Sequence, residues 1–240
     1  MQNRYAGDVG DFSKFGLLRQ IATVGFAIGL NWYLVADEAH NKDGKHIGYL
    51  TDSKFDGCDD QLRELLCSVA NGDRNVSMLE KQNLINNATY FSEPLSPPAT
   101  SHFSRSDWHN RAMEKLHSAD IIFLDPDNGV LVNSVSPNSN KSIKYAMRDE
   151  IIDYYYAGHS VIFYNHRCRE NEVKYLKRFE WMYNEATLKS AKILGLKFVR
   201  GSTRDYIFAI QPKHIAGVFT AIDAVLQDPW KKHFTKLNMP

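Results

Sequence analysis

The sequence contains few cysteines, no excess of charge of either sign and no long apolar run. Its three cysteines, Cys58, Cys67 and Cys168, do not have the spacing of metal ligands, and a small, odd number of cysteines is a poor disulfide framework. We therefore expect a reducing, cytoplasmic setting. The 29 basic and 28 acidic residues leave a net charge of +1, which excludes a global attraction to nucleic acid but allows a local basic groove. No stretch approaches the ~18 apolar residues of a membrane span, and the first residues lack a signal-peptide core, so no membrane association and no processing are expected.

The composition and the order of apolar patterns predict a single α/β domain. The 240 residues are 43% hydrophobic, which is enough for a large core. Strand-like stretches alternate with helical ones, which predicts a mostly parallel sheet covered on both faces, with a C-terminal antiparallel hairpin over residues 196–210. Because the long connection at residues 92–106 has strands on both sides of it, we predict one domain over residues 1–240.

Periodicity places the individual elements along the chain. It predicts helices over residues 11–29, 58–72, 105–119, 145–158, 170–195 and 212–227. It predicts strands over residues 30–37, 75–80, 88–93, 120–125 and 159–165. Asp11 is the predicted cap of the first helix, whereas Arg4, Asp8 and Lys14 stay open as parts of a lid over a site.

The stretch IIFLDPDNGV is an apolar strand that ends in polar side chains. Asp125, Asp127 and Asn128 follow the apolar residues almost directly. Such a sequence is typical of a turn, because Asp and Asn bond to their own backbone and Gly129 permits a positive φ. Ligands of open parallel sheets bind beyond the carboxyl ends of the strands, which favours a functional site at the same place.

Two stretches and the order of the elements resemble methyltransferases that depend on S-adenosylmethionine. The order resembles their Rossmann-like three-layer sandwich with a seven-stranded sheet. FLDPDNG resembles the Asp-Pro-Pro-Tyr motif of amino-methyltransferases, with Asp127 and Asn128 in place of the second proline and the aromatic residue. YAGDVGDFSKFGLLRQI is similar to the opening helix of the bacterial large-subunit ribosomal RNA adenine methyltransferases. The whole chain also resembles an uncharacterised group of bacterial proteins that open with Asn-Arg-Tyr and carry Asp-Pro-Asp-Asn-Gly.

The resemblance implies methyl transfer to an amino group of nucleic acid, RNA or DNA. It makes the first, fourth and fifth strands neighbours, so that polar residues after each of them meet. The implied catalytic residues are Asp125, Asp127, Asn128 and His166. The implied cofactor-binding residues are Asp37, Glu38, His40 and Glu80, the last at the end of the second strand beside the ribose. The implied substrate-binding residues are Lys14, Lys45 and Arg167. The charged residues 37–46 stand in place of the family's glycine-rich turn after the first strand.

A metal-dependent phosphodiesterase or nuclease is an alternative for the same residues. Asp37, Asp125 and Asp127 offer hard oxygen ligands for Mg²⁺ or Mn²⁺. A histidine from residues 40, 46 or 166 would serve as a further ligand or move a proton. A divalent cation would explain why several carboxylates gather, since they otherwise repel one another.

A non-catalytic binding protein is the third hypothesis, and several features also have plain structural explanations. The residues 37–46 are also typical of a solvated loop. Arg167 can form a surface ion pair with Glu170 or Glu172. The C-terminal WKKHFTK is a small basic and aromatic patch, a candidate contact for a phosphate backbone.

Overall fold

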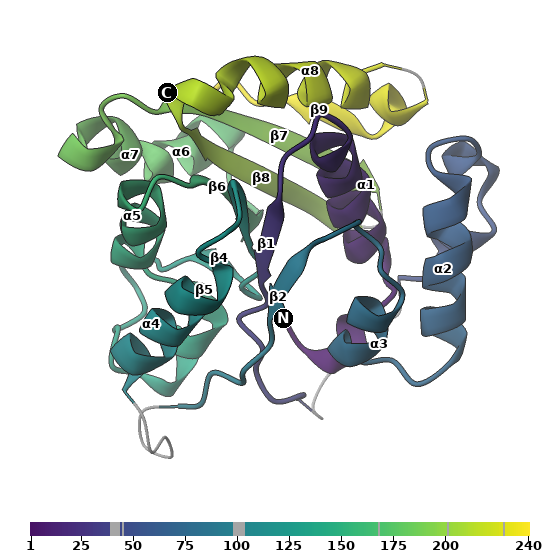
Figure 1. Cartoon of the computed structure of the whole chain (residues 1–240), viewed down its shortest axis with the longest axis horizontal. Coiled ribbons are helices and arrows are strands. Elements are labelled where there is room, and N and C mark those ends of the chain that lie inside the picture. Colours follow the sequence, from purple (N-terminus) through teal and green to yellow (C-terminus); the bar gives the residue numbers. More distant parts are fainter. Residues whose placement is uncertain (39–43, 45, 98–103, 168, 201, 228) are drawn as a thin grey trace.

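The computed structural model describes residues 1–38, 44, 46–97, 104–167, 169–200, 202–227 and 229–240. In this part of the chain, seven strands form one mixed sheet in the order β2-β1-β3-β6-β8-β7-β9 (Figure 1). The strands are β1 (Ile28–Asn31), β2 (Thr89–Phe91), β3 (Ile121–Leu124), β6 (Ser160–His166), β7 (Lys192–Arg200), β8 (Ser202–Ile210) and β9 (Phe234–Lys236). The first four in the sheet order are parallel, and each of the other three is antiparallel to its neighbour. A separate two-stranded parallel sheet consists of β4 (Gly129–Val130) and β5 (Tyr145–Ala146).

Helices cover both faces of the large sheet (Figure 1). They are α1 (Val9–Thr23), α2 (Asp60–Asn71), α3 (Val76–Lys81), α4 (Arg105–Leu116), α5 (Arg148–Tyr156), α6 (Glu172–Leu176), α7 (Trp181–Asn184) and α8 (Ile215–Val225). Successive strand residues point to opposite faces, so β3 contributes to two cores. Ile121 and Phe123 belong to the core that includes α1 and α8. Ile122 and Leu124 belong to the core that includes α4 and α5.

The α/β class, the parallel half of the sheet and the C-terminal hairpin are confirmed. β7 and β8 pair from Lys192 with Ile210 to Arg200 with Ser202, so the hairpin begins before residue 196. All residues of β1 and β3 are buried, the pattern of strands that are covered on both faces.

The strand predicted over residues 75–80 is wrong, because these residues form α3. The side chain of Asn75 accepts a hydrogen bond from the backbone N–H of Met78 at 2.9 Å and caps the helix. Val76 and Leu79 are then buried on the same side of the helix. Glu80 consequently lies on a helix and does not end a strand.

Two helix predictions are wrong in their extent. The predicted helix at residues 170–195 is broken into α6, short 3₁₀ turns and α7, and from Lys192 onward the chain belongs to β7. Extended backbone at Glu185 ends α7. The predicted helix at residues 11–29 begins earlier, because Asp8 and not Asp11 is its cap, and it ends at Thr23. The strand predicted over residues 30–37 ends at Asn31.

The aromatic side chains of the C-terminal stretch are part of the core. Trp230, His233 and Phe234 are buried. The ring of His233 stacks on Phe55 with the centroids 4.3 Å apart. Buried rings are not available to a nucleic acid, so the exposed part of this stretch consists of its lysines, Lys231, Lys232 and Lys236, and of Thr235.

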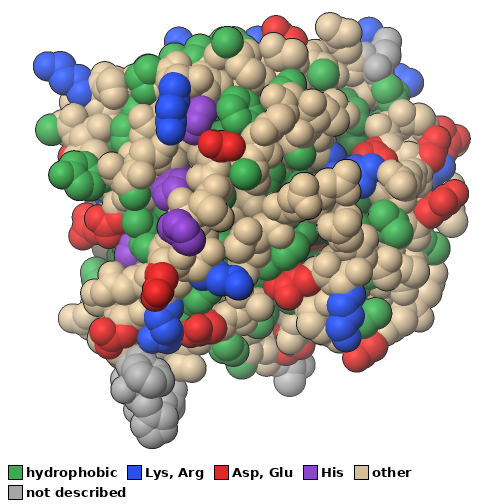
Figure 2. All heavy atoms as spheres, in the orientation of Figure 1, with side chains coloured by type: hydrophobic (Ala, Val, Ile, Leu, Met, Phe, Trp, Pro, Cys, Tyr) green, Lys and Arg blue, Asp and Glu red, His purple; other side chains and the backbone are tan. Residues whose placement is uncertain are grey.

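The molecular surface mixes charges of both signs. On the face drawn in Figure 2, Lys and Arg side chains alternate with Asp and Glu side chains among the coloured residues. No helix in the described part of the chain is long and apolar enough to cross a membrane. A contact with nucleic acid would therefore depend on local features of the surface.

Candidate active site

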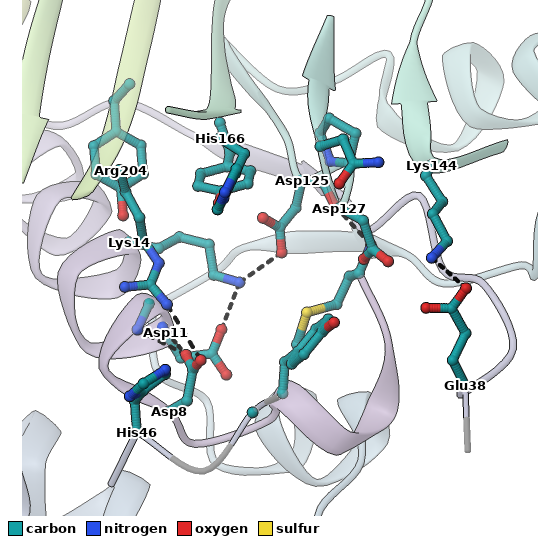
Figure 3. Close-up of a pocket in the computed structure, with 18 residues that line it drawn as sticks. Asp8, Asp11, Lys14, Glu38, His46, Asp125, Asp127, Lys144, His166 and Arg204 are labelled. Carbon is teal, nitrogen blue, oxygen red and sulfur yellow. Dashed lines mark hydrogen bonds and ion pairs between the residues drawn. The ribbon is translucent and has the colours of Figure 1, made fainter. Parts of the chain in front are cut away.

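A pocket of about 570 Å³ lies at the carboxyl ends of the parallel strands. Its wall includes residues before and in the first turns of α1, residues after β1, the stretch Asp125–Asn128 after β3, and residues of β6 and β8. Figure 3 shows the acidic and basic side chains of these segments pointing toward one another. Segments far apart in the sequence therefore build one site at the edge where ligands of open sheets bind.

A buried ammonium joins two carboxylates on one side of the pocket. Nζ of Lys14 lies 2.7 Å from Oδ2 of Asp125 and 2.6 Å from Oδ1 of Asp11. It also lies 4.4 Å from the ring centroid of Trp32, within the range of a cation–π contact. Burial alone would lower the pKa of Lys14, but the two carboxylates raise it above its ordinary value, so the amine stays charged.

Asp11 has an unusual pKa among these carboxylates. Burial raises its pKa from 3.8 to about 6, although Lys14 acts in the opposite direction. Its second oxygen, Oδ2, accepts a hydrogen bond from the backbone N–H of Gly7 at 2.8 Å. Asp11, Asp125 and Lys14 together carry one net negative charge when both carboxylates are ionised, which favours a cationic group in a ligand.

Asp127 is held by the first residues of the chain. The amino group of Met1 lies 2.8 Å from Oδ1 of Asp127, and the side-chain amide of Gln2 donates to Oδ2 at 2.6 Å. Burial alone would raise the pKa of Asp127, but the Met1 ammonium and the Gln2 amide hold it below its ordinary value. Asp127 is therefore an ionised residue whose two oxygens are both engaged.

The remaining wall is built by β6, β8 and the chain after β1. His166 lines the pocket at the end of β6, with Nδ1 3.1 Å from the hydroxyl of Tyr164. Arg204 lies opposite His166 in the β6–β8 pairing. Glu38 forms an ion pair with Lys144 on the other side of the pocket.

Other residues that the sequence analysis named lie away from this pocket. Asp37 is exposed and accepts a hydrogen bond from the backbone N–H of Arg4 at 3.2 Å. Glu80 accepts one from the indole of Trp32 at 2.9 Å. Arg167 forms ion pairs with carboxylates on neighbouring elements, Asp205 and Glu172. His40 and Lys45 lie outside the described residues.

Comparison with known proteins does not identify a family for this chain. Neither the models of protein families nor the curated proteins give a match to this sequence. The chemistry of the pocket must therefore be argued from its own groups.

The carboxylates of the pocket are balanced by cations that the chain itself supplies. Asp125 is matched by Lys14, and Asp127 by the Met1 amino group. Over the described ranges, no group of three or more His, Cys, Asp and Glu side chains is placed to hold a metal ion. The metal hypothesis also needed Asp37, which lies elsewhere, so the arrangement gives it no support.

One oxygen of Asp125 remains available to a ligand. Lys14 holds Oδ2, whereas none of the described residues bonds to Oδ1 (Figure 3). Its backbone N–H donates to the carbonyl of Asn31 at 2.9 Å, which fixes the start of the polar stretch. Asp125 is thus a rigid carboxylate with a free acceptor facing a pocket large enough for a small molecule.

Sequence reasoning missed Asp11 and Arg204 as pocket residues. Asp11 was assigned to a helix cap, but the helix begins earlier and the side chain turns inward to Lys14. Arg204 lies in a strand of the hairpin, and only the register that places it opposite His166 brings it to the site. The signal in the sequence is the pair of charges, Arg204 and Asp205, directly before the apolar second half of the strand.

Proposed function

We propose that the protein is an S-adenosylmethionine-dependent methyltransferase of the Rossmann-like type that acts on an amino group of nucleic acid. One observation carries this proposal: Lys14 and Asp125, 111 residues apart, bond to each other in the wall of one pocket. They come from the two stretches that separately resemble methyltransferases. Two independent resemblances that converge on one pocket support the proposal more than either does alone.

The topology of the sheet supports the same proposal. The resemblance implies that the first and fourth strands are neighbours, that the fifth follows, and that a hairpin completes the sheet. β1, β3 and β6 lie in that order and are followed by β8 and β7. The pocket then lies where this class of fold binds its ligands, beyond the carboxyl ends of the central strands.

The pocket's own groups suit an amine and a cationic cofactor. S-adenosylmethionine, when bound, supplies an electrophilic methyl group on a positively charged sulfur. The excess negative charge shared by Asp11, Lys14 and Asp125 favours a positive group nearby. The free Oδ1 of Asp125 would accept a hydrogen bond from the target amino group and orient its lone pair toward the methyl group. Because Lys14 holds the other oxygen, this orientation costs little reorganisation.

The experiment that tests this proposal measures binding before activity. Purified protein would be titrated calorimetrically with S-adenosylmethionine and S-adenosylhomocysteine, and then supplied with tritiated cofactor and RNA or DNA. We expect binding of both compounds by the wild type, and label transfer that falls at least about 100-fold in Asp125→Asn, which removes the charge but keeps the shape. Asp56→Asn is the matched control, because Asp56 is an exposed partner of Arg63.

Two outcomes would contradict the proposal. Absence of binding by either adenosyl compound would remove the cofactor and leave a binding protein as the better hypothesis. Thermal stabilisation of the EDTA-treated protein by Mg²⁺ or Mn²⁺ alone, lost in Asp125→Asn, would instead favour the metal-dependent phosphodiesterase. A ligand at 100 times its Kd adds about 2.7 kcal/mol of stability, so either effect is measurable.

A further inference from the structure

The guanidinium of Arg204 is a buried cation in the pocket wall with hydrogen-bonding capacity to spare. Arg204 is 8% exposed. Its Nη2 lies 3.3 Å from Oδ2 of Asp8, while its Nη1 is buried and has no hydrogen-bond partner in the part of the chain that the structure describes. A buried donor that lacks an acceptor is costly and uncommon in folded proteins.

Two other arginines of the chain use the whole guanidinium group. Arg105 donates from Nε, Nη1 and Nη2 to Glu150 and to two backbone carbonyls. Arg167 uses the same three nitrogens to bind two carboxylates. Arg105 and Arg167 therefore satisfy every nitrogen. Arg74, which binds the carbonyl of Ala6, keeps one buried nitrogen without a hydrogen bond among the described residues, as Arg204 does, but it does not line the pocket.

The groups around Arg204 are already engaged with other partners. Oδ1 of Asp8 caps α1 by accepting from the backbone N–H groups of Gly10 and Asp11, which leaves only its other oxygen for Arg204. The hydroxyl of Tyr206 pairs with Ser13 at 2.5 Å. None of these groups satisfies Nη1.

Arg204 is part of the wall of the pocket. Among the described residues, several buried side-chain donors lack a hydrogen bond, but Arg204 is the one that lines the pocket. The ammonium of Lys14 is held by two carboxylates, and Lys144 is held by Glu38. Figure 3 shows Arg204 beside Lys14 and Asp8 at one side of the cavity.

We propose that Arg204 binds an oxyanion, a carboxylate or a phosphate, of the molecule that enters this pocket. A guanidinium presents a planar fork of donors that matches either group with two hydrogen bonds. The identity of the anion rests on the proposed function, because S-adenosylmethionine would bring a carboxylate and a nucleic acid would bring a phosphate. The shared chemistry is the anionic oxygen pair, and the two sources are separated by experiment.

The test compares pairs of ligands that differ in the group that carries the anion. S-adenosylhomocysteine and 5′-methylthioadenosine differ by the amino-acid group, and adenosine 5′-monophosphate and adenosine differ by the phosphate. Affinities would be measured by calorimetry for the wild type, Arg204→Gln and Arg204→Lys. Arg63→Gln is the matched control, because Arg63 pairs with Asp56 and Asp60 on the surface.

The expected result is a loss of discrimination within one pair. In Arg204→Gln, the affinity ratio of that pair should fall about 10-fold or more, the size expected for a charged hydrogen bond. Arg204→Lys keeps the charge without the fork and should give an intermediate ratio. Arg63→Gln should leave both ratios unchanged. A ratio of two ligands on one protein is insensitive to partial unfolding, so a destabilised variant still reports on the contact.

The outcomes separate this inference from the proposed function. If the wild type binds neither S-adenosylmethionine nor S-adenosylhomocysteine, the proposed function is contradicted. The pair of adenosine 5′-monophosphate and adenosine would still test the role of Arg204. A fall in the first ratio identifies the carboxylate and a fall in the second identifies the phosphate, and either supports the inference. Unchanged ratios in both pairs, or no preference of the wild type for the anionic member of either pair, would overturn it.

Discussion

Replacement of Asp11 by Asn should remove a specific pH dependence from the stability of the protein. Asp11 is fully buried beside Lys14, and its pKa is raised from 3.8 to about 6, mainly by burial. The folded state therefore binds a proton at a higher pH than the unfolded chain does. This group contributes stability that is complete below about pH 3.8 and is lost as the pH rises through about 6.

The size of the effect follows from the shift in pKa. One unit corresponds to about 1.4 kcal/mol, so the full difference is about 3 kcal/mol. Most of it appears between about pH 6 and pH 4. Between pH 8 and pH 5 the wild type should gain about 1 kcal/mol relative to Asp11→Asn, and by pH 4 about 2 kcal/mol. The amide oxygen of Asn can still accept from the backbone N–H of Gly7, so the local fold should persist.

Urea unfolding of both proteins at several pH values between 4 and 8 measures this difference. Subtracting the two curves removes the contributions of every other titrating group, provided that these are unchanged by the substitution. The quantity to report is the free energy of unfolding of the wild type minus that of the variant. If this difference stays constant across the range, Asp11 does not titrate there, and the account of the buried Asp11–Lys14–Asp125 group is refuted.

Two further predictions concern the frame around the site. At Gly129 φ is +99°, and an added Cβ would lie 2.0 Å from Oδ1 of Asn165, whereas at Gly158 φ is +95° and no atom lies within 4 Å. We therefore expect Gly158→Ala to cost about 1 kcal/mol and Gly129→Ala at least about 2 kcal/mol more by urea unfolding; equal costs would mean that the pocket-side turn has room. Burial lowers the pKa of His214, whose Nδ1 lies 2.8 Å from Oγ of Ser160, so the unfolded chain takes up the proton first as the pH falls below about 6.5 and stability is lost. His214→Gln should lose less stability than the wild type between pH 7.5 and pH 5, and an identical loss in thermal unfolding would contradict this.

Strong local signals made most of the central strands and helices predictable. The continuous apolar stretch before Asp125 forms a buried strand, because such a sequence is typical of a strand in a sheet that is covered on both faces. The helix predicted over residues 58–72 is α2, which is capped by the side chain of Asp59 and ends just before Gly72. The long prediction over residues 170–195 failed because a helical period continues across short turns, and periodicity carries no information about where the backbone becomes extended.

The site was predictable only where local sequence carries the information. The structure places Lys14, Glu38, Asp125–Asn128 and His166 in the wall of the pocket. Each of these lies in or next to a stretch whose pattern already indicated a strand end or a helix start. Glu80 was assigned by its place after a strand, and that assignment failed together with the strand.

The gathering of carboxylates could not be interpreted from the sequence because their counterions come from distant segments. Asp125 and Asp127 after one strand suggest either a metal or an amine, since like charges do not gather without compensation. The compensation here comes from Lys14 on α1 and from the amino group of Met1, more than a hundred residues away. Arg204 arrives through the register of β8 against β6, which no local pattern specifies. The carboxylates could thus be identified in the sequence, whereas the cations that reach them from distant segments are a property of the fold.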